Sequence, residues 1–382
     1  MSSTPHTPRP GTASPVRVLS LLKGLARGGA ESLVLVGTRQ RDSEEFDYAV
    51  AYISAGHVDL VQELESEGVP VLSLGGAGTW DPRWLWRLRK VLSEVDVVHA
   101  HSPVPAVGAR LARLTLSRRK RPGLITTEHN VWASHHRLTR LAERATFYLD
   151  DEHLAVSEAV RASLPSTLQG EVEVLLQGVD LARVRAAADR EGVRRELGIG
   201  VGELVVGTVA NLRPQKGYVD LLVAAAEVVR RVPNARFVAV GQGDQLDELT
   251  QLQLELGLTE RFSFVGYRED AVRVMSGFDV FCLASHHEGL PVALMEALGL
   301  GIPVVVTRAG GMGELVEDGV EGALVEPRRP EILAEALVAS LLDETVRKEQ
   351  AERAAERGDG LSIQRSVIAH EELYARLGRH RV

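Results

Sequence analysis

Short apolar segments alternate with longer amphipathic ones along the chain from Val16 onward. The short segments are rich in Val, Leu and Ile and predict buried strands, whereas apolar residues recur in the longer segments at the spacing of a helix. Strands are expected at residues 16–22, 47–53, 97–99, 124–127, 153–156 and 172–176, and again at 204–209, 236–240, 262–265, 280–283 and 302–307. This alternation is typical of parallel α/β sheets.

The strand pattern is interrupted over residues 177–203, which end in a glycine-rich run. We interpret this segment as the seam between two doubly wound α/β domains that face one another across a cleft. The first domain is predicted over residues 16–180 and the second over 181–362. A C-terminal helical segment is predicted over residues 363–382.

Composition narrows the class of protein. The chain has 382 residues, of which 45% are hydrophobic, enough for two packed cores. With 44 basic and 52 acidic residues the net charge is −8, the wrong sign for a chain whose main partner is nucleic acid. The single cysteine, Cys282, cannot form an internal disulfide, which indicates a reducing compartment.

The first 15 residues are rich in Ser, Thr and Pro and are expected to form a disordered extension rather than a signal peptide. No stretch reaches the roughly 18 uncharged apolar residues that would span a bilayer. A cytoplasmic location is therefore expected.

Two glutamates, Glu288 and Glu296, flank the predicted start of a helix. Pro291 suits the first helical turn, so the helix is predicted to begin there, with Glu288 in the preceding loop. In a continuous helix the two glutamates would lie about 12 Å and about 80° apart, so they would contact different parts of an extended ligand. Spacing alone, however, favours two solvated glutamates.

A basic loop follows the first strand of the second half, with the sequence Ala-Asn-Leu-Arg-Pro-Gln-Lys-Gly over residues 210–217. Arg213 and Lys216 would lie between a strand and the N-terminus of a helix, an arrangement suited to a diphosphate. The chain contains only five lysines, which makes Lys216 more informative than a lysine usually is.

Together these segments resemble a known family. The basic loop, Gly241-Gln242-Gly243, Phe264-Val265-Gly266-Tyr267 and the Glu288-x7-Glu296 segment are similar, in order and spacing, to the large family of retaining glycosyltransferases that carry the E-x7-E motif and the GT-B fold. In the first half, Gly28-Gly29-Ala30-Glu31, Asp96 to His101, Thr127 to Asn130 and Ala155 to Glu158 follow in the order of the family. The resemblance covers about Val16 to Pro327 and implies two Rossmann-like domains.

The resemblance implies a role for each residue that matches a motif. Glu288 would bind the donor sugar and Glu296 the ribose hydroxyls of the nucleotide. Lys216, with Arg213, would hold the diphosphate and neutralise the charge that develops on the leaving group. His129 would face the donor sugar from the first domain.

Further groups are expected to complete the donor site. The remaining donor-binding candidates are Gly289, Leu290, Pro291, Val292, Tyr267, Arg268, Asn211 and Gly241. The amides of the first four would assist Glu288, and the backbone near Tyr267 and Arg268 would lie against the base. Gly28 and Gly29 would let the backbone approach the diphosphate or the acceptor.

The resemblance also bears on the mechanism. Retention of the anomeric configuration in this family is usually attributed to attack on the same face of the sugar from which the leaving group departs. The departing phosphate takes the acceptor proton. No metal and no cofactor are expected, since the nucleotide sugar is a co-substrate and the chain has no Asp-x-Asp pair. The last helix is expected to cross back to the first domain.

The sequence departs from the family at two positions. The usual Gly-Arg pair that opens the basic loop is replaced by Ala210-Asn211, and the arginine is displaced to Arg213. The usual Asn-Gly-Val-Asp after the first domain begins with Gln177. The first change makes the role of Arg213 less secure than that of Lys216.

Two other chemistries are disfavoured. His99 and His101 share a face of a strand and could form half of a metal site, but no third ligand is evident. The segment Gly24 to Gly29 follows a strand but does not match G-x-G-x-x-G, which argues against a nicotinamide dehydrogenase.

A membrane contact is conceivable. Three of the four tryptophans lie in the segment Trp80 to Arg87, and basic residues gather at Arg118 to Arg121. These groups could contact a membrane surface that carries a lipid-linked acceptor. The alternative is a helix packed on the sheet, together with cations at the C-terminus of another helix.

The sequence therefore predicts a metal-independent retaining glycosyltransferase that moves a sugar from a nucleotide diphosphate, most simply UDP, to a hydroxyl of a saccharide, a lipid-linked acceptor or a small molecule. No nucleic acid partner is expected, and no oligomeric state is indicated. A nucleotide-sugar epimerase of the same fold and a catalytically silent scaffold that binds nucleotide sugars stay as alternatives.

Overall fold

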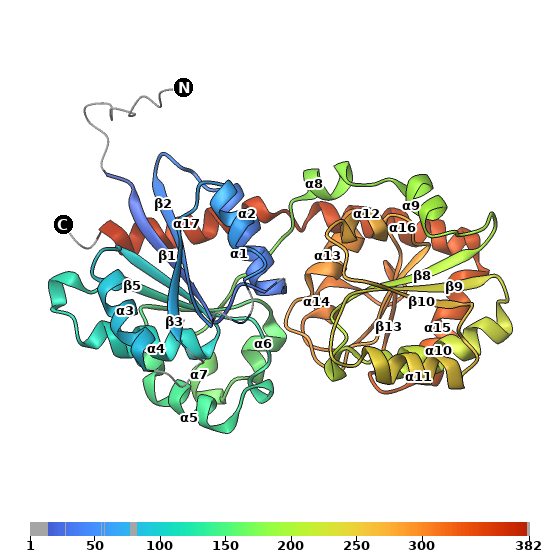
Figure 1. Ribbon diagram of the computed structural model, residues 1–382, viewed down its shortest axis with the longest axis horizontal. Coiled ribbons are helices and arrows are strands. Elements are labelled where there is room, and N and C mark those ends of the chain that lie inside the picture. Colours follow the sequence, from blue (N-terminus) through green and yellow to red (C-terminus); the bar gives the residue numbers. More distant parts are fainter. Residues whose placement is uncertain (1–13, 27, 55, 57, 77–81, 380–382) are drawn as a thin grey trace. The chain divides into compact units, whose positions relative to one another are not determined.

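The computed structural model describes residues 14–26, 28–54, 56, 58–76 and 82–379, which form two β-sheets covered by helices (Figure 1). They divide into two compact units. The first contains the described part of Met1–Thr126, with Leu141–Glu152 and the last helix from Val367, and the second contains Thr127–Arg140 and His153–Ser366. The domain boundary at residue 180 stays a prediction. Of the extension predicted over residues 1–15, the structure describes only residues 14 and 15.

The first sheet has seven strands in the order β3-β2-β1-β4-β5-β6-β7. They are β1 (Val16–Leu22), β2 (Phe46–Ser54), β3 (Val71–Gly76), β4 (Val97–His101), β5 (Gly123–Glu128), β6 (Glu152–Ala155) and β7 (Glu173–Val174). β1 pairs in parallel with both β2 and β4, so the direction in which strands are added reverses at β1.

The second sheet repeats this order with six strands, β10-β9-β8-β11-β12-β13, and every neighbouring pair is parallel. They are β8 (Leu204–Val209), β9 (Ala235–Val240), β10 (Phe262–Gly266), β11 (Val280–Leu283), β12 (Val304–Thr307) and β13 (Gly322–Val325). Here the direction reverses between β8 and β11. Ligands of doubly wound sheets bind beyond the carboxyl ends of strands at such a switch point.

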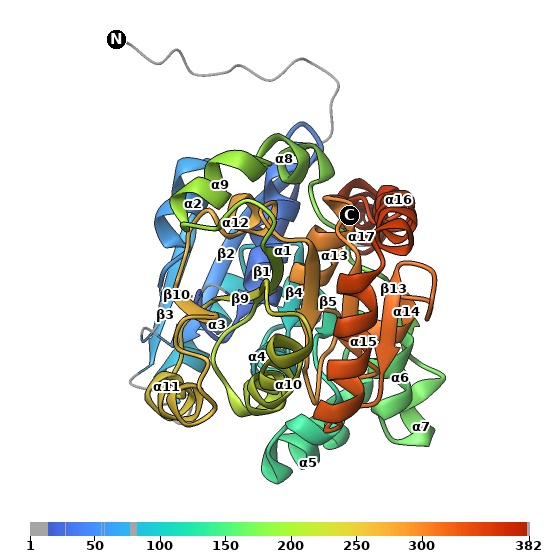
Figure 2. The same cartoon turned by 90° about the vertical axis from the view of Figure 1, so that its right-hand side faces the viewer.

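Helices connect the strands and cover both faces of the second sheet. Figure 2 shows α10, α11 and α15 on one face, while α12, α13 and α16 lie on the other. The helices of the first half are α1 (Gly29–Arg39), α2 (Val61–Ser66), α3 (Arg83–Leu92), α4 (Pro103–Leu114), α5 (Arg137–Thr146), α6 (Glu158–Ser163) and α7 (Ser166–Gln169). Those that follow are α8 (Leu181–Ala186), α9 (Arg190–Glu196), α10 (Tyr218–Arg231), α11 (Leu246–Glu255), α12 (Ala271–Met275), α13 (Val292–Gly299), α14 (Met312–Leu315), α15 (Pro330–Leu342), α16 (Glu344–Asp359) and α17 (Ile363–Arg379). Four single 3-10 turns are η1 (Arg118–Lys120), η2 (Trp132–Ser134), η3 (Phe147–Leu149) and η4 (Pro214–Lys216).

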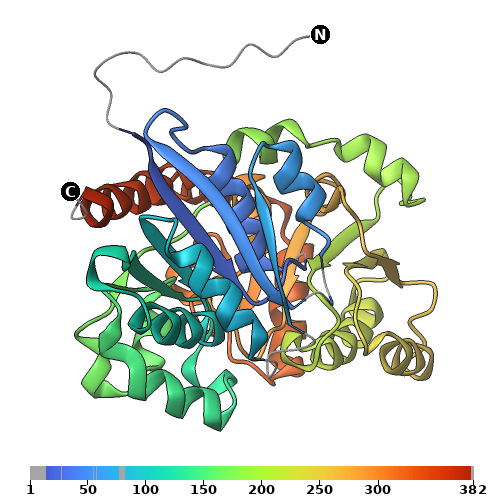
Figure 3. The same cartoon turned by 60° about the vertical axis from the view of Figure 1, so that its left-hand side comes forward.

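The last helix packs within the first unit, where it runs beside β1 and β2 (Figures 1 and 3). Gly378 lies against Val16, and the ring of Tyr374 lies edge-on to that of Phe46 at 6.3 Å between centroids. The Tyr374 hydroxyl is 2.6 Å from Nδ1 of His99 at the centre of the sheet. The C-terminal segment of the chain is therefore part of the first core.

The predicted parallel α/β class is confirmed, and the strands predicted at 204–209 and 280–283 are observed with those bounds. Two strands were missed, β3 and β13, because their glycines read as parts of loops. The strand predicted at 172–176 shrinks to the two residues of β7, and the one predicted at 302–307 begins only at Val304, directly after Pro303.

The tryptophan-rich segment divides between core and surface. Trp80 lies outside the described residues. Trp84, on α3, is buried against α4, where a Cβ on Gly108 would lie 1.9 Å from its ring. Trp86 points outward and is exposed. Trp84 is therefore a core residue, as expected for a helix packed on a sheet.

A buried ion-pair cluster joins α4 to α5 in the first unit. The guanidinium of Arg110 is 2.8 Å from Oε1 of Glu143 and also pairs with both oxygens of Asp150. All three side chains are at most 1% exposed. Burial alone would lower the pKa of Arg110, but the hydrogen bonds and charges of the two carboxylates raise it above its usual value.

Removing the cation should destabilise this unit strongly. We expect Arg110→Met to lower the free energy of unfolding by about 3–5 kcal/mol, because two buried carboxylates would lose their partner. Urea unfolding followed by tryptophan fluorescence, which reports on buried Trp84, measures the effect. Arg329→Met, at an exposed arginine, is the control, and equal losses in the two variants would contradict this role.

Candidate functional site

Two loops meet where β8 and β11 end, at the switch point of the second sheet. The loop after β8 carries Lys216 at the end of η4, and the loop after β11 carries Glu288. The Lys216 Nζ is 2.6 Å from Oε1 of Glu288, and the Glu288 side chain is only 9% exposed. Parallel packing thus joins two of the predicted residues, 72 positions apart, in one ion pair.

Ser285 also binds the Glu288 carboxylate. Its hydroxyl donates to the same Oε1 at 2.6 Å, and its carbonyl oxygen accepts a hydrogen bond from the hydroxyl of Thr307 at the end of β12. Sequence reasoning did not single out either residue. The nearness of Ser285 to Glu288 in the sequence was the available clue, whereas the contact with Thr307 required the order of the sheet.

The two loops touch through a glycine that has no room for a side chain. Gly217 has a φ of +66°, and a Cβ there would lie 2.0 Å from the carbonyl oxygen of Ala284. L-residues rarely adopt this conformation. The backbone N–H of His286 also donates to the carbonyl of Gln215 at 2.7 Å. These contacts hold the Lys216 loop against the Glu288 loop.

The segment from Gly289 to Val292 leads from Glu288 into α13. A Cβ on Gly289 would lie 1.9 Å from the carbonyl oxygen of His129, so the backbone of His129 lies directly against this segment. Leu290 and Pro291 are buried. The helix predicted to begin at Pro291 begins at Val292, with an extended Pro291 as its N-cap.

Glu296 lies in the second turn of α13 and is partly buried. Within the described part of the chain its carboxylate has no hydrogen bond and no ion pair. Burial raises the pKa of this carboxyl to about 7. The described residues place no hydrogen-bond donor on this carboxyl, and such donors would favour its ionised form.

Arg213 and Asn211 precede the Lys216 loop. The Arg213 side chain is exposed and forms neither an ion pair nor a side-chain hydrogen bond with the residues that the structure describes. Asn211 is partly buried, and its carbonyl oxygen accepts a hydrogen bond from the N–H of Arg213 at 2.9 Å. The structure thus does not bring the Arg213 side chain to Glu288, and its role in the site stays a prediction.

The ends of β9 and β10 form the next part of this sheet edge. The N–H of Gly241 donates to the carbonyl of Gly266 at 2.9 Å. Tyr267 is exposed, whereas the guanidinium of Arg268 is 2.7 Å from both Asp270 and Glu196. The Arg268 side chain is thus engaged by two carboxylates.

A histidine and an aspartate that the sequence analysis missed lie beside Lys216. Nε2 of His286 is 2.7 Å from Oδ2 of Asp220, in the first turn of α10. His286 follows Ser285 in the loop after β11, and Asp220 lies four residues after Lys216. The pair links the loop after β11 to the first turn of α10.

Gly28, Gly29, His99 and His101 lie in the first unit, whereas His129 belongs to the second. Gly28 is the N-cap of α1, and Gly29 is the first residue of this helix. The ring of His99 lies 4.2 Å from that of His101 and 5.2 Å from that of His370, tilted with respect to both. Among the described residues, no three His, Cys, Asp or Glu side chains are grouped so that they could hold a metal ion.

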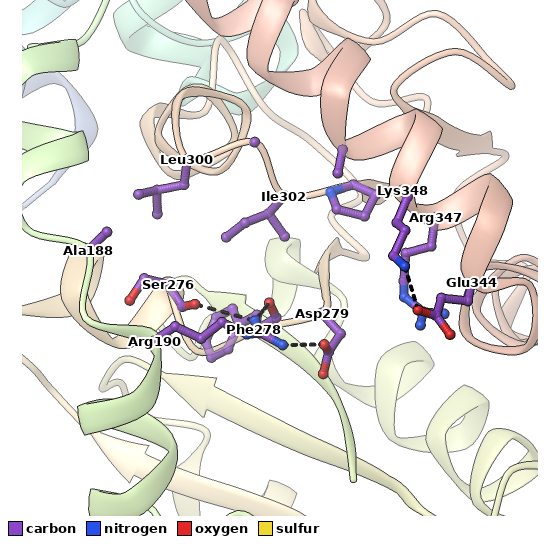
Figure 4. Close-up of a pocket in the computed structure, with 13 residues that line it drawn as sticks. Ala188, Arg190, Ser276, Phe278, Asp279, Leu300, Ile302, Glu344, Arg347 and Lys348 are labelled. Carbon is purple, nitrogen blue, oxygen red and sulfur yellow. Dashed lines mark hydrogen bonds and ion pairs between the residues drawn. The ribbon is translucent and has the colours of Figure 1, made fainter. Parts of the chain in front are cut away.

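A pocket of about 490 Å³ lies in the second unit, at the opposite end of the strands. Residues that line it, such as Asp279 and Pro303, precede β11 and β12 rather than follow them. Figure 4 shows that four of its charged side chains are paired, Arg190 with Asp279 and Lys348 with Glu344. None of the predicted site residues lines this pocket.

Among the residues that the structure describes, no helix is both long and apolar enough to cross a bilayer.

The two halves of the chain match two glycosyltransferase families. Residues 15–183 match Glycosyltransferase Family 4, and residues 189–358 match Glycosyl transferases group 1. Each match covers one of the two sheets and its connecting helices.

Similar proteins include several glycosyltransferases. The D-inositol 3-phosphate glycosyltransferase of Corynebacterium jeikeium is 34% identical over 217 residues, which are 54% of this chain and about half, 52%, of that protein. The UDP-Gal:alpha-D-GlcNAc-diphosphoundecaprenol alpha-1,3-galactosyltransferase of Escherichia coli is 25% identical over 94% of this chain and 95% of its own.

Among solved structures, Anabaena HepE in complex with UDP-glucose superimposes with a TM-score of 0.81. The match covers 94% of this chain and 99% of HepE at 24% identity, which supports a common fold. With both halves matched to glycosyltransferase families, and with two doubly wound sheets in the corresponding order, the chain belongs to the GT-B glycosyltransferases.

Proposed function

We propose that the protein is a retaining glycosyltransferase that moves a sugar from a nucleotide diphosphate to an acceptor hydroxyl. The observation that carries the proposal is the Lys216–Glu288 ion pair at the switch point of the second sheet. A buried carboxylate beside an ammonium group offers an acceptor for sugar hydroxyls next to a cation for phosphate.

The roles of the residues follow from their chemistry. Glu288, oriented by Ser285, accepts hydrogen bonds from the donor sugar, assisted by backbone amides between Gly289 and Val292. Lys216 binds the diphosphate, where its charge stabilises the leaving group as the glycosidic bond breaks. Glu296, which has no partner among the described residues, accepts hydrogen bonds from the ribose hydroxyls of the nucleotide.

The transfer needs no protein nucleophile. The bond between the anomeric carbon and the diphosphate oxygen breaks while the acceptor oxygen bonds to the same face of that carbon. The acceptor proton passes to the departing phosphate, so charge and atoms balance without a metal ion. The carbonyl of His129, which lies against Gly289, brings a segment of the first half of the chain to the edge of this site.

UDP is the nucleotide that we propose for the donor. The name of the galactosyltransferase from E. coli specifies UDP-Gal, and HepE has been crystallised with UDP-glucose. The backbone near Tyr267 and Arg268, which follows β10, lies against the base in this proposal. The acceptor is a compound with a free hydroxyl.

Substitution of the ion pair tests the proposal. We expect Lys216→Met and Glu288→Gln each to lower kcat by about 10²–10³-fold with UDP-sugars, because each removes charge or orientation at the reacting centre. Mass spectrometry of reactions with UDP-glucose, UDP-galactose and UDP-N-acetylglucosamine, each with simple sugar and inositol acceptors, detects the product.

Lys348→Met, at an exposed lysine of α16, is the matched control and should leave kcat unchanged. A wild-type protein that isomerises the nucleotide sugar and forms no glycoside would contradict transfer. Full activity in both Lys216→Met and Glu288→Gln would instead contradict the assignment of the site.

The pH dependence of donor binding tests the role of Glu296. Its carboxyl has a pKa of about 7 in the free protein, and ribose hydroxyls that donate to it favour its ionised form. Binding should therefore lower this pKa and release a proton, so that affinity for UDP-glucose rises as the pH increases from about 5 to 7 and then levels off.

Calorimetry in buffers with different ionisation enthalpies measures the released proton. UDP-glucose is the suitable probe, because both of its phosphates are esterified and do not titrate in this range. Glu296→Gln should bind more weakly and release no proton. The role of Glu296 fails if proton release persists in this variant or is absent from the wild type.

A further inference from the structure

Helix α5 turns a charged side chain toward the protein interior and apolar side chains toward the solvent. The face turned inward carries Glu143, which is 1% exposed and paired with Arg110. The face turned outward carries Leu138 and Leu141, which are 57% and 66% exposed. A surface helix normally buries its apolar stripe, so this stripe lacks its usual covering.

The exposed apolar residues form one continuous stripe. At 3.6 residues per turn, Leu138, Leu141 and Ala145 lie on the same side of α5. The stripe continues at Tyr148 in the following turn η3, where the ring is 69% exposed. It is therefore about three helical turns long.

Arginines border this stripe on one side. The same helical geometry places Arg137, Arg140 and Arg144 on an adjacent strip of α5. None of the three forms an ion pair with a carboxylate of the described residues. The aliphatic stems of arginine side chains can lie along an apolar surface while the charged heads reach phosphates.

The surrounding segment is strongly basic although the protein is acidic. Residues 82–152 contain 13 Lys or Arg and seven Asp or Glu, a net charge of +6 in a chain whose total is −8. Two of the acidic residues, Glu128 and Glu143, are buried. Turn η1, with its three consecutive basic residues, belongs to this segment. A charge imbalance of this size indicates an anionic partner.

We propose that the outward face of α5 docks the protein on a membrane surface that contains anionic lipids. The apolar stripe would enter the boundary between headgroups and acyl chains, while the arginines bind lipid phosphates. A second copy of the chain is a poorer occupant, because an interface between two such faces would bring six arginines together and supply no anionic partner for them. The docking helix thus differs from the tryptophan-rich segment expected from the sequence, whose Trp84 is buried.

Sedimentation with lipid vesicles tests this proposal on the full chain. We expect the wild type to sediment with vesicles of phosphatidylcholine containing 30% phosphatidylglycerol and to stay in the supernatant with phosphatidylcholine alone. Leu138→Gln/Leu141→Gln and, separately, Arg137→Gln/Arg144→Gln should each weaken binding by about tenfold or more. Binding should also weaken at 0.5 M salt, because surface charges are screened.

Matched variants outside α5 control for nonspecific effects. Leu254→Gln/Leu342→Gln removes two similarly exposed leucines, and Arg329→Gln/Arg353→Gln removes two exposed arginines. Both should bind vesicles like the wild type, and all variants should keep the thermal unfolding midpoint of the wild type. No binding by the wild type, or equal binding by the α5 variants, would overturn the proposal.

Two further outcomes are informative. An oligomer that dissociates in Leu138→Gln/Leu141→Gln, without vesicle binding by the wild type, would assign the face to another copy of the chain and overturn lipid docking. The assay contains neither donor nor acceptor, so its result is independent of the proposed glycosyl transfer.

Discussion

The parallel order of the second sheet is the constraint on which the candidate site depends. β8 lies between β9 and β11, so the loops that leave β8 and β11 emerge side by side at one edge. Lys216 and Glu288 can therefore meet although three strands and the helices between them separate the two residues in the chain. A strand placed between β8 and β11 would separate the ammonium group from the carboxylate and leave the buried Glu288 without this cation.

Close backbone contacts fix the positions of the two loops that carry Lys216 and Glu288. Gly217 lies against Ala284, and Gly289 lies against the carbonyl of His129, with no space for a side chain in either place. In the loop after β11, Ser285 donates a hydrogen bond to Glu288, and Thr307 at the end of β12 donates one to the carbonyl of Ser285. In this arrangement the charged groups are held before a ligand arrives, which is the condition under which electrostatic stabilisation of a transition state is most effective.

In the first unit, a buried ion pair accompanies an unusual orientation of helix α5. Its buried cation, Arg110, draws Glu143 of α5 inward, and the leucines of that helix consequently face outward. The inverted helix is thus a result of electrostatics in the core rather than of helix propensity. It also explains how a chain with a net charge of −8 can present a locally basic and apolar surface.

The sequence by itself determined the α/β class, most strands and the groups that could bind a phosphate or a sugar, because burial of parallel strands and loop chemistry leave local patterns. Lys216 was recognisable from its basic loop, whereas Glu288 and Gly289 were identified through the resemblance to the family motif. Only the tertiary structure decided that Ser285 and Thr307 orient Glu288, that Arg268 is held by Glu196, and that α5 is inverted. These features depend on residues far apart in the chain, and local spacing carries no information about which distant carboxylate or hydroxyl will lie beside a given group. Strands β3 and β13 were missed for a related reason, since a glycine reads as a turn until its neighbours in the sheet are known.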